Sequence, residues 1–302
     1  RDATGASTDR QKARRQYGGY RTMIDRTGMV WAGGGSRGIF TAGAIDYLIE
    51  QDMKIPYVIG VSAGACNAVD YVSGQIGRTR ECMIVKEKAY RYVSMRNMIK
   101  QKSLFDMDMI FDKFPNQYIP FDYDVFFHSG MTCEITVTNC ITGKAEYYSE
   151  RRDKERLMQL CRASSSLPLA APMVFINGVP YLDGGIGNSI PIGRSIRVGN
   201  RKHIVILTRK EGYRKRTDNR KAAFIKRYYR GYPRLIQSIL RRPYVYNRTL
   251  DLMDELEKQG KIFVIRPQDK IISKVERKPD KLEEFYRHGY EQMKERFDDL
   301  MC

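Results

Sequence analysis

The side chains that build many common protein sites are scarce in this sequence. Its 302 residues include six cysteines, three histidines and one tryptophan. Six cysteines are too few for a disulfide scaffold, and they form neither a C-x-x-C pair nor a zinc-finger spacing with histidine, so we expect no structural zinc. Reduced, mostly buried thiols favour a reducing compartment, so we expect a cytoplasmic protein that can lie peripherally at a membrane.

Long apolar stretches are also missing. No apolar run approaches the roughly 18 residues of a membrane-spanning helix. The first twenty residues are polar and basic and contain no apolar segment of the kind found in secretory signals. We therefore expect neither a transmembrane helix nor a secretory signal in this sequence.

Acidic residues are outnumbered by basic ones. The chain has 35 Asp and Glu against 53 Lys and Arg, which gives a net charge of +18. This balance excludes an acidic solubilising protein and favours partners such as phosphate, nucleic acid or an anionic membrane surface. Hydrophobic residues make up 42% of the chain, which is enough for a sizeable core. The length suits about two average domains or one large α/β domain.

The pattern of apolar residues predicts alternating strands and helices. Apolar runs at 28–32 and 56–59 predict two strands, each followed by glycines and then by a helix, at about 37–50 and 63–72. Two such units in succession predict an α/β fold with a parallel sheet. Further patterns predict hairpins within 134–149 and 173–182, strands at 203–208 and 261–265, and helices at 78–100, 154–165 and from 279 onward.

The segment 103–128 has a composition of its own. It is dense in Phe, Met, Ile and Tyr but is interrupted by Pro115 and Pro120, so it fits neither a regular helix nor a strand. One interpretation is an irregular segment packed on the core. The other is a lid or wall of an apolar substrate pocket.

A glycine-rich loop, GGGSRG, joins the first predicted strand to its helix at residues 33–38. It matches the G-x-G-x-x-G pattern of dinucleotide-binding proteins, but that reading requires an acidic residue at the end of the second strand, where this sequence has GVS. The alternative is an oxyanion hole, in which N–H groups around Gly34 and Gly35 stabilise a developing negative charge. Glycine suits this role because a side chain would block the approach.

The second motif, GVSAG at 60–64, lies where the second predicted strand meets its helix. In this context G-x-S-x-G predicts a nucleophile elbow, a tight turn that exposes the hydroxyl of Ser62 above the sheet edge. Gly60 and Gly64 would keep neighbouring side chains out of the turn. The positive end of the following helix would face the charge that develops in the reaction.

The third motif, DGG at 183–185, follows a predicted hairpin strand. The carboxylate of Asp183 can reach a serine at another strand end, and Gly184 and Gly185 allow a close backbone approach. No histidine is an attractive base: His203 begins its strand, His288 lies among core positions of a helix, and His128 precedes Asp183 in the chain. We therefore expect a Ser62–Asp183 dyad, in which the carboxylate takes the serine proton directly.

The three motifs in this order, GGGSRG, GVSAG and DGG, resemble those of the patatin-like phospholipases. The likeness covers about residues 28–208, and the stretches SSSLPLAAPMV and YLDGGIGNSIPI are similar to the bacterial branch. The resemblance implies a three-layer α/β/α fold with a mostly parallel sheet and hydrolysis of lipid acyl esters without a metal or other cofactor. On this basis we divide the chain into a tail or edge segment (1–27), a catalytic domain (28–208) and a basic helical region packed on it (209–302).

Carried over by position, the resemblance makes Ser62 the nucleophile and Asp183 the base. It assigns the oxyanion hole to the three glycines of the loop, with Arg37 orienting that loop and Gly38, Gly60, Gly64, Gly184 and Gly185 as supporting positions. The oxyanion glycines are Gly33, Gly34 and Gly35. Two departures stand out: Ala32 replaces the acidic residue that many members have before the glycines, and DGG replaces the commoner DGA.

The basic region lies outside these motifs. Residues 209–248 hold fourteen Lys and Arg and two acidic residues, which accounts for a net +12. They could form amphipathic helices with a solvated basic face, an interfacial surface for anionic lipid, or a nucleic-acid surface, although no known nucleic-acid module is present and we expect none to bind. The sequence therefore predicts a lipid acyl hydrolase, with a non-catalytic protein that binds an anionic membrane as the alternative. It does not predict an oligomeric state.

Overall fold

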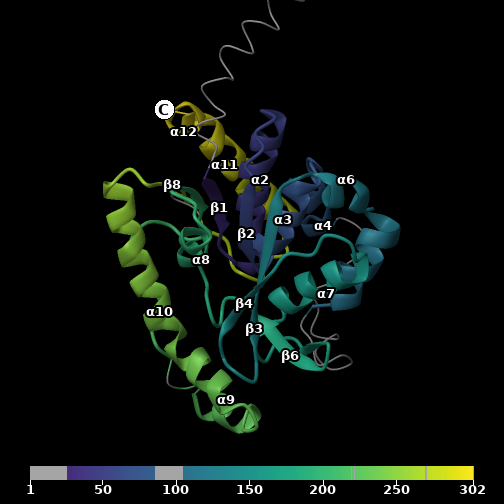
Figure 1. Ribbon diagram of the computed structural model, residues 1–302, viewed down its shortest axis with the longest axis vertical. Helices are drawn as coiled ribbons and strands as arrows, with labels where there is room; N and C mark the ends of the chain where they lie inside the picture. The colour runs from purple at the N-terminus through teal and green to yellow at the C-terminus, as the bar shows by residue number, and fades with distance from the viewer. Residues whose placement is uncertain (1–25, 86–104, 219, 221, 269–270, 302) are drawn as a thin grey trace, which may run out of the picture.

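A single mixed β-sheet forms the centre of the protein. The computed structural model describes residues 26–85, 105–218, 220, 222–268 and 271–301 (Figure 1). Within these residues the strands follow the spatial order β5-β6-β3-β2-β1-β7-β8, and β4 pairs with β3. The strands are β1 (Thr27–Trp31), β2 (Tyr57–Val61), β3 (Thr132–Asn139), β4 (Ala145–Tyr148), β5 (Val174–Ile176), β6 (Val179–Asp183), β7 (Lys202–Ile206) and β8 (Ile262–Ile265).

The middle of the sheet is parallel. Strands β3, β2, β1, β7 and β8 run in one direction, whereas β4 and β6 pair antiparallel with β3, and β5 pairs antiparallel with β6. Parallel strands are covered on both faces, which explains their continuous apolar runs. In β1, Met29 and Trp31 pack into one hydrophobic cluster, while Val30 packs into the cluster on the opposite face.

Helices cover both faces of the sheet and give the protein three layers. Apolar side chains of α2, α3, α7 and α11 share the cluster of Met29, and those of α8 and α10 share the cluster of Val30. The predicted fold class, a mostly parallel α/β/α arrangement with a helical C-terminal region, is confirmed. The helices are α2 (Gly38–Glu50), α3 (Ala63–Val72), α4 (Arg78–Met83), α6 (Tyr123–His128), α7 (Lys154–Ser165), α8 (Ile192–Arg197), α9 (Ala222–Tyr228), α10 (Pro233–Lys258), α11 (Pro279–Glu295) and α12 (Phe297–Met301), with a 3₁₀ turn η1 (Gly35–Arg37) and a π-helix η3 (Met109–Tyr118).

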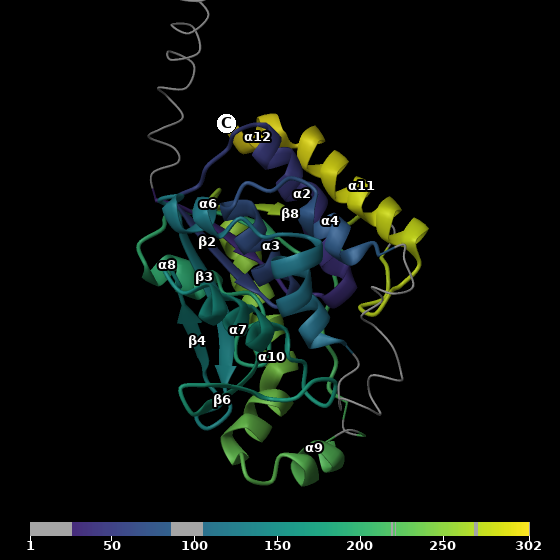
Figure 2. The same cartoon turned by 90° about the vertical axis from the view of Figure 1, so that its right-hand side faces the viewer.

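The C-terminal part of the chain is built into the sheet and its helical cover. Strand β8 extends the sheet beside β7, and α11 lies along α2 (Figure 2). These two helices are in very close contact, because a Cβ atom on Gly289 would collide with the carbonyl oxygen of Phe40. The α11 side chains Leu282, Phe285 and Met293 are buried here.

Two sequence-based expectations differ from the structure. The helix expected over 78–100 ends at Met83, and residues 86–104 lie outside the described residues, as does the segment 1–25. The expectation that 103–128 contains no regular helix is wrong, because η3 and α6 occupy most of it. A π-helix has more residues per turn than the 3.6 of an α-helix, so its apolar residues do not follow the α-helical spacing. Pro115 also lies inside this helix, and an internal proline normally argues against a helix.

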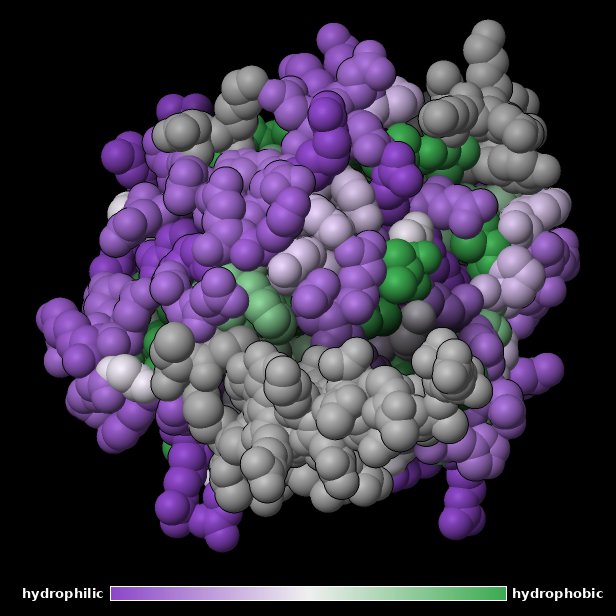
Figure 3. Space-filling view, turned by 90° about the horizontal axis from the view of Figure 1, so that it is seen from above, coloured by the Kyte–Doolittle hydropathy of each residue, from purple (hydrophilic) through white to green (hydrophobic). Residues whose placement is uncertain are grey.

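The surface gives two further observations. Among the described helices, none combines the length and the apolar composition needed to cross a bilayer. The face at the top of Figure 1 carries mostly hydrophilic side chains, and its coloured hydrophobic residues form small, separate patches (Figure 3). In Figure 1, α10 runs along one side of the molecule and reaches α9 at the lower end.

Candidate active site

Ser62 occupies a tight turn between β2 and α3. Its φ of 57° and ψ of −124° place a non-glycine residue in a region of backbone strain. The turn is compact because a Cβ atom on Gly60 would collide with the carbonyl group of Gly64, and one on Gly64 would lie 2.5 Å from the carbonyl oxygen of Trp31. This geometry matches the strand–turn–helix arrangement that the GVSAG motif predicted.

Asp183 lies at the end of β6 and is 1% exposed. Its Oδ1 accepts a hydrogen bond from the N–H of Gly185 at 2.8 Å. Its Oδ2 is buried and has no hydrogen-bond partner among the described residues. A buried carboxylate oxygen without a donor is costly, and this one is free to accept a proton or a hydrogen bond. Ser62 and Asp183 line the same cavity.

The end of α7 connects the serine turn to the aspartate loop. The buried Oγ of Ser164 accepts the N–H of Ser62 at 2.8 Å and donates to the carbonyl oxygen of Thr136 at 2.6 Å. The carbonyl of Ser166 accepts the N–H of Asp183 at 2.8 Å. Sequence reasoning did not assign these serines, although they open the SSSLPLAAPMV stretch that carries part of the family resemblance.

The glycine loop approaches Ser62 from β1. A Cβ atom on Gly33 would lie 3.0 Å from the Cβ of Ser62. Gly35 has a φ of +58°, and a side chain there would collide with the carbonyl oxygen of Lys274. In the described part of the chain, the N–H groups of Gly34, Gly35 and Ala63 donate to no backbone or side-chain acceptor. Ala63 follows the serine, so its N–H is a further donor that sequence reasoning did not include.

The remaining predicted positions surround this core of the site. Arg37 is buried, its Nε has no hydrogen-bond partner among the described residues, and burial together with the charge of Arg209 lowers its pKa to about 10. A Cβ atom on Gly38 would lie 2.5 Å from the Cβ of Ala63, so this glycine lets the starts of α2 and α3 meet. A side chain on Gly184 would collide with the carbonyl of Thr136, and a Cβ atom on Gly185 would lie 2.8 Å from the Oδ1 of Asp183.

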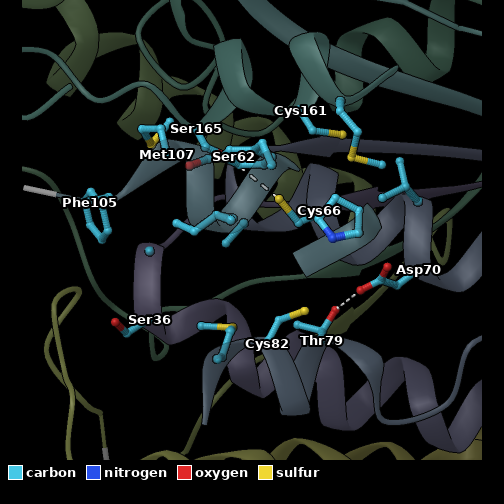
Figure 4. Close-up of a pocket in the computed structure, with 18 of the residues that line it drawn as sticks. Ser36, Ser62, Cys66, Asp70, Thr79, Cys82, Phe105, Met107, Cys161 and Ser165 are labelled. Carbon is cyan, nitrogen blue, oxygen red and sulfur yellow. Dashed lines mark hydrogen bonds between the residues drawn. The ribbon is translucent and has the colours of Figure 1, made fainter. Parts of the chain in front are cut away.

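An apolar cavity opens on one side of Ser62 (Figure 4). Its walls include Cys66, Cys82 and Cys161, and burial raises the pKa of Cys66 to about 11 and that of Cys82 to about 12, so these thiols stay neutral. The segment 103–128 supplies part of the wall and is also packed on the core, which combines the two interpretations of its sequence. Its residues in the wall are Phe105, Met107, Ile110, Phe111 and Pro115.

A second cavity, which also reaches Ser62, is lined by charged groups. It contains Asp183 and the glycine loop. Five basic side chains also line it: Arg37, Arg209, Lys215, Arg242 and Lys274. Sequence reasoning found the charge excess of region 209–248 but did not place any of it at the site, because nothing in the spacing indicates which residues turn inward.

No histidine is among the residues that line either cavity in the described part of the chain. His203 lies at the start of β7, where its Nδ1 is 3.0 Å from the Oγ of Ser195 and burial lowers its pKa to about 4. His128 is exposed beside Asp124, and the ring of His288 packs edge-on against that of Phe40. Among the described residues, the cavity that Ser62 shares with Asp183 is therefore lined by a carboxylate and by no imidazole.

Two family models match different parts of this chain. The family model described as Patatin-like phospholipase matches residues 29–195, a span that includes Ser62 and Asp183. A second family model, Domain of unknown function (DUF6363), matches residues 232–301. Uncharacterized protein YjjU of Escherichia coli strain K12 is 29% identical over 188 residues, which cover 61% of this chain and 52% of that protein. The chain therefore matches about half of the length of that relative.

Among solved structures, VipD from Legionella pneumophila aligns with 90% of this chain and 67% of its own. The sequence identity is 14% and the TM-score is 0.48.

Proposed function

The chain belongs to the patatin-like phospholipase family, and from this premise we propose that it is a serine acyl hydrolase that cleaves carboxylic esters of lipids. The proposal covers phospholipase A, lysophospholipase and related acyl hydrolase activities. One observation carries it: a strained serine turn and a buried carboxylate with an unused oxygen line the same cavity.

The first half-reaction forms an acyl-enzyme. The Oγ of Ser62 attacks the acyl carbon while its proton passes to Oδ2 of Asp183. The N–H groups of Gly34, Gly35 and Ala63 stabilise the oxyanion of the tetrahedral intermediate. When the intermediate collapses, the C–O bond to the alcohol breaks, and the departing oxygen takes the proton from Asp183.

The second half-reaction releases the fatty acid. Water attacks the acyl carbon and gives a proton to Asp183, and the oxyanion forms again in the same place. Collapse then breaks the bond to Ser62, whose oxygen takes the proton back from Asp183. The apolar cavity beside Ser62 would hold the acyl chain in both steps. Because this cavity is lined by Met, Phe and neutral Cys side chains, it favours a lipid ester as substrate.

Labelling with a fluorophosphonate probe tests this proposal. We expect the wild type to be labelled, and Ser62→Ala and Asp183→Asn to lose both labelling and hydrolysis of a p-nitrophenyl ester while keeping their circular dichroism spectra. Ser165→Ala is the matched control, because that serine lines the apolar cavity but its hydroxyl faces the Sγ of Cys66 at 3.8 Å. Full activity of Ser62→Ala would refute the proposal.

The alternative is a protein that uses this fold to bind an anionic membrane. It is favoured by exposed aromatic residues on the basic helices: Phe224 is 57% exposed, Tyr228 59% and Tyr244 62%. Aromatic rings beside basic side chains suit the headgroup layer of a bilayer. In this case, charge reversal at Arg227, Arg230 and Arg234 should abolish sedimentation with anionic vesicles, whereas Ser62→Ala should have no effect on function.

A further inference from the structure

A group of basic side chains shares the cavity of Ser62 and Asp183. Asp183 is the one acidic side chain among the described residues that line this cavity. Four of the five basic side chains, Arg209, Lys215, Arg242 and Lys274, lie outside the span 29–195 that matches the patatin family model. They take no part in the dyad mechanism described above, so their position at the reaction centre needs a separate explanation.

Two of these cations meet at one hydroxyl group. The Nζ of Lys215 lies 3.2 Å, and the Nε of Arg242 3.4 Å, from the Oγ of Ser189. That hydroxyl donates to the carbonyl oxygen of Gly185 at 2.7 Å. A Cβ atom on Gly185 would lie 2.9 Å from the Nη2 of Arg242. The guanidinium group therefore lies against the loop that carries Asp183.

Aromatic rings pack against two members of this basic group. The Nζ of Lys215 is 3.9 Å from the ring centroid of Tyr246, and the guanidinium carbon of Arg209 is 4.2 Å from that of Tyr213. These rings attract a cation without neutralising it. They position positive charge at the cavity while leaving it available to an anion.

The described residues do not balance the positive charge of this group. Among the described residues, Arg37, Arg209, Lys215 and Arg242 form no ion pair with a carboxylate. Arg37 is 8% exposed and its Nε has no hydrogen-bond partner among these residues. Burial, and next the charge of Arg242, lowers the pKa of Lys215 to about 6. At neutral pH the Lys215 amine is therefore mostly uncharged, and an anion that enters beside it would favour its protonated form while stabilising the charge of the neighbouring arginines.

We propose that the basic group of Arg37, Arg209, Lys215 and Arg242 binds the phosphate of the substrate while the acyl chain occupies the apolar cavity. This inference rests on the proposed function. Ser62, Gly35 and Leu167 line both cavities, so an ester between the two would lie at the nucleophile. Guanidinium groups bind phosphate oxygens in pairs. The substrate is then a lipid with an anionic phosphate headgroup, because a zwitterionic headgroup would add a cation to the group.

Two soluble substrates with the same eight-carbon acyl chain test the inference. One is a lysophosphatidic acid and the other is the corresponding monoacylglycerol, which lacks the phosphate. We expect the wild type to hydrolyse the phosphate-bearing lipid with at least a tenfold higher kcat/KM. In Arg242→Gln and Lys215→Gln the ratio of the two kcat/KM values should fall at least tenfold, mainly through KM.

Arg241→Gln is the matched control, since it removes the same charge from an exposed neighbour on α10. Its ratio should equal that of the wild type. An equal fall of kcat/KM on both substrates in Arg242→Gln would overturn the inference, because it would mean that the cations act on Asp183 instead. An unchanged ratio would overturn it as well.

Inorganic phosphate separates a lipid headgroup from a free anion. If inorganic phosphate inhibits lysophosphatidic acid hydrolysis competitively, and if this inhibition is weaker in Arg242→Gln, the result supports binding of the lipid headgroup by the basic group. If phosphate instead changes the rate of monoacylglycerol hydrolysis and does not compete with lysophosphatidic acid, the inference is overturned, because the basic group then binds free phosphate as an effector.

Calorimetric titration of phosphate into Ser62→Ala reports on the basic group independently of catalysis. If Ser62→Ala binds phosphate but the wild type hydrolyses no ester, only the proposed function is refuted. If the wild type hydrolyses esters but Ser62→Ala binds no phosphate, only this inference is refuted.

Discussion

Removal of the Ser164 hydroxyl should show most clearly whether this group positions Ser62 or only stabilises the fold. It is fully buried, accepts the N–H of Ser62 and donates to the carbonyl of Thr136. Ser164→Ala removes both bonds and leaves two buried polar groups without these partners. At about 1–3 kcal/mol for each such group, we expect the free energy of unfolding to fall by about 2–6 kcal/mol.

The catalytic consequence should exceed the loss of stability. The backbone strain at Ser62 persists only where its surroundings hold it, and the bond to Ser164 is part of those surroundings. A displacement of about 1 Å at a reacting group can cost about a hundredfold in rate. We therefore expect kcat for a p-nitrophenyl ester to fall roughly a hundredfold, with little change in KM because the walls of the apolar cavity remain.

Ser195→Ala provides the matched control. Ser195 is also fully buried and its Oγ also has two hydrogen-bonding partners, His203 and Asn200, but it lies near the start of β7, at the other end of the sheet. Thermal melts of the two variants should shift by similar amounts, whereas kcat should fall only in Ser164→Ala. If kcat in Ser164→Ala stays within threefold of the wild type while the melting temperature falls, the positioning role is refuted.

Three further predictions concern other parts of the molecule. Arg78→Met leaves the buried Asp70 without its ion-pair partner, and urea unfolding should show a loss of about 3–5 kcal/mol; a loss below 1 kcal/mol would contradict this. Burial raises the pKa of Asp46 to about 6, so the folded state retains a proton that the unfolded chain loses near pH 4, and stability should fall as pH rises from about 4 to 6. Asp46→Asn should flatten that part of the urea-derived stability profile, and an unchanged slope would refute the assignment. Phe111→Ala enlarges the apolar cavity, so the preferred acyl length in a p-nitrophenyl ester series should increase; the same optimum would show that the chain lies elsewhere.

Most of the fold followed from local patterns. Residues 28–32 and 56–59 are apolar runs that each end at a glycine, and each coincides within a residue or two with a strand of the parallel sheet. The π-helix η3 was missed because its period is not that of an α-helix and because Pro115 lies within it. In such a segment the burial of Phe111 and Phe114 outweighs the local preference, and burial depends on the rest of the chain.

Some residues of the candidate site could be predicted from the sequence and others could not. Ser62, Asp183 and the glycine loop were predictable because their spacing follows from the tight turns that the chemistry needs. Their catalytic roles stay predictions, as does the domain boundary near residue 208. Ser164 and Lys215 could not be predicted, because a serine at a helix end and a lysine in a basic stretch have many ordinary uses. Only the folded chain places one beneath Ser62 and the other beside Asp183.

The order in which the parts of the site occur along the chain has a consequence for its synthesis. Ser62 and Asp183 leave the ribosome first, but the neighbour of β7, strand β8, and the helix that packs along α2 come from residues 262–265 and 279–295. Until these emerge, one edge of the sheet is unpaired and the apolar face of α2 is uncovered. A nascent chain therefore cannot complete this core before the residues up to 295 have been translated, so this edge of the sheet and the cover of α2 are finished long after Ser62 and Asp183 have been made.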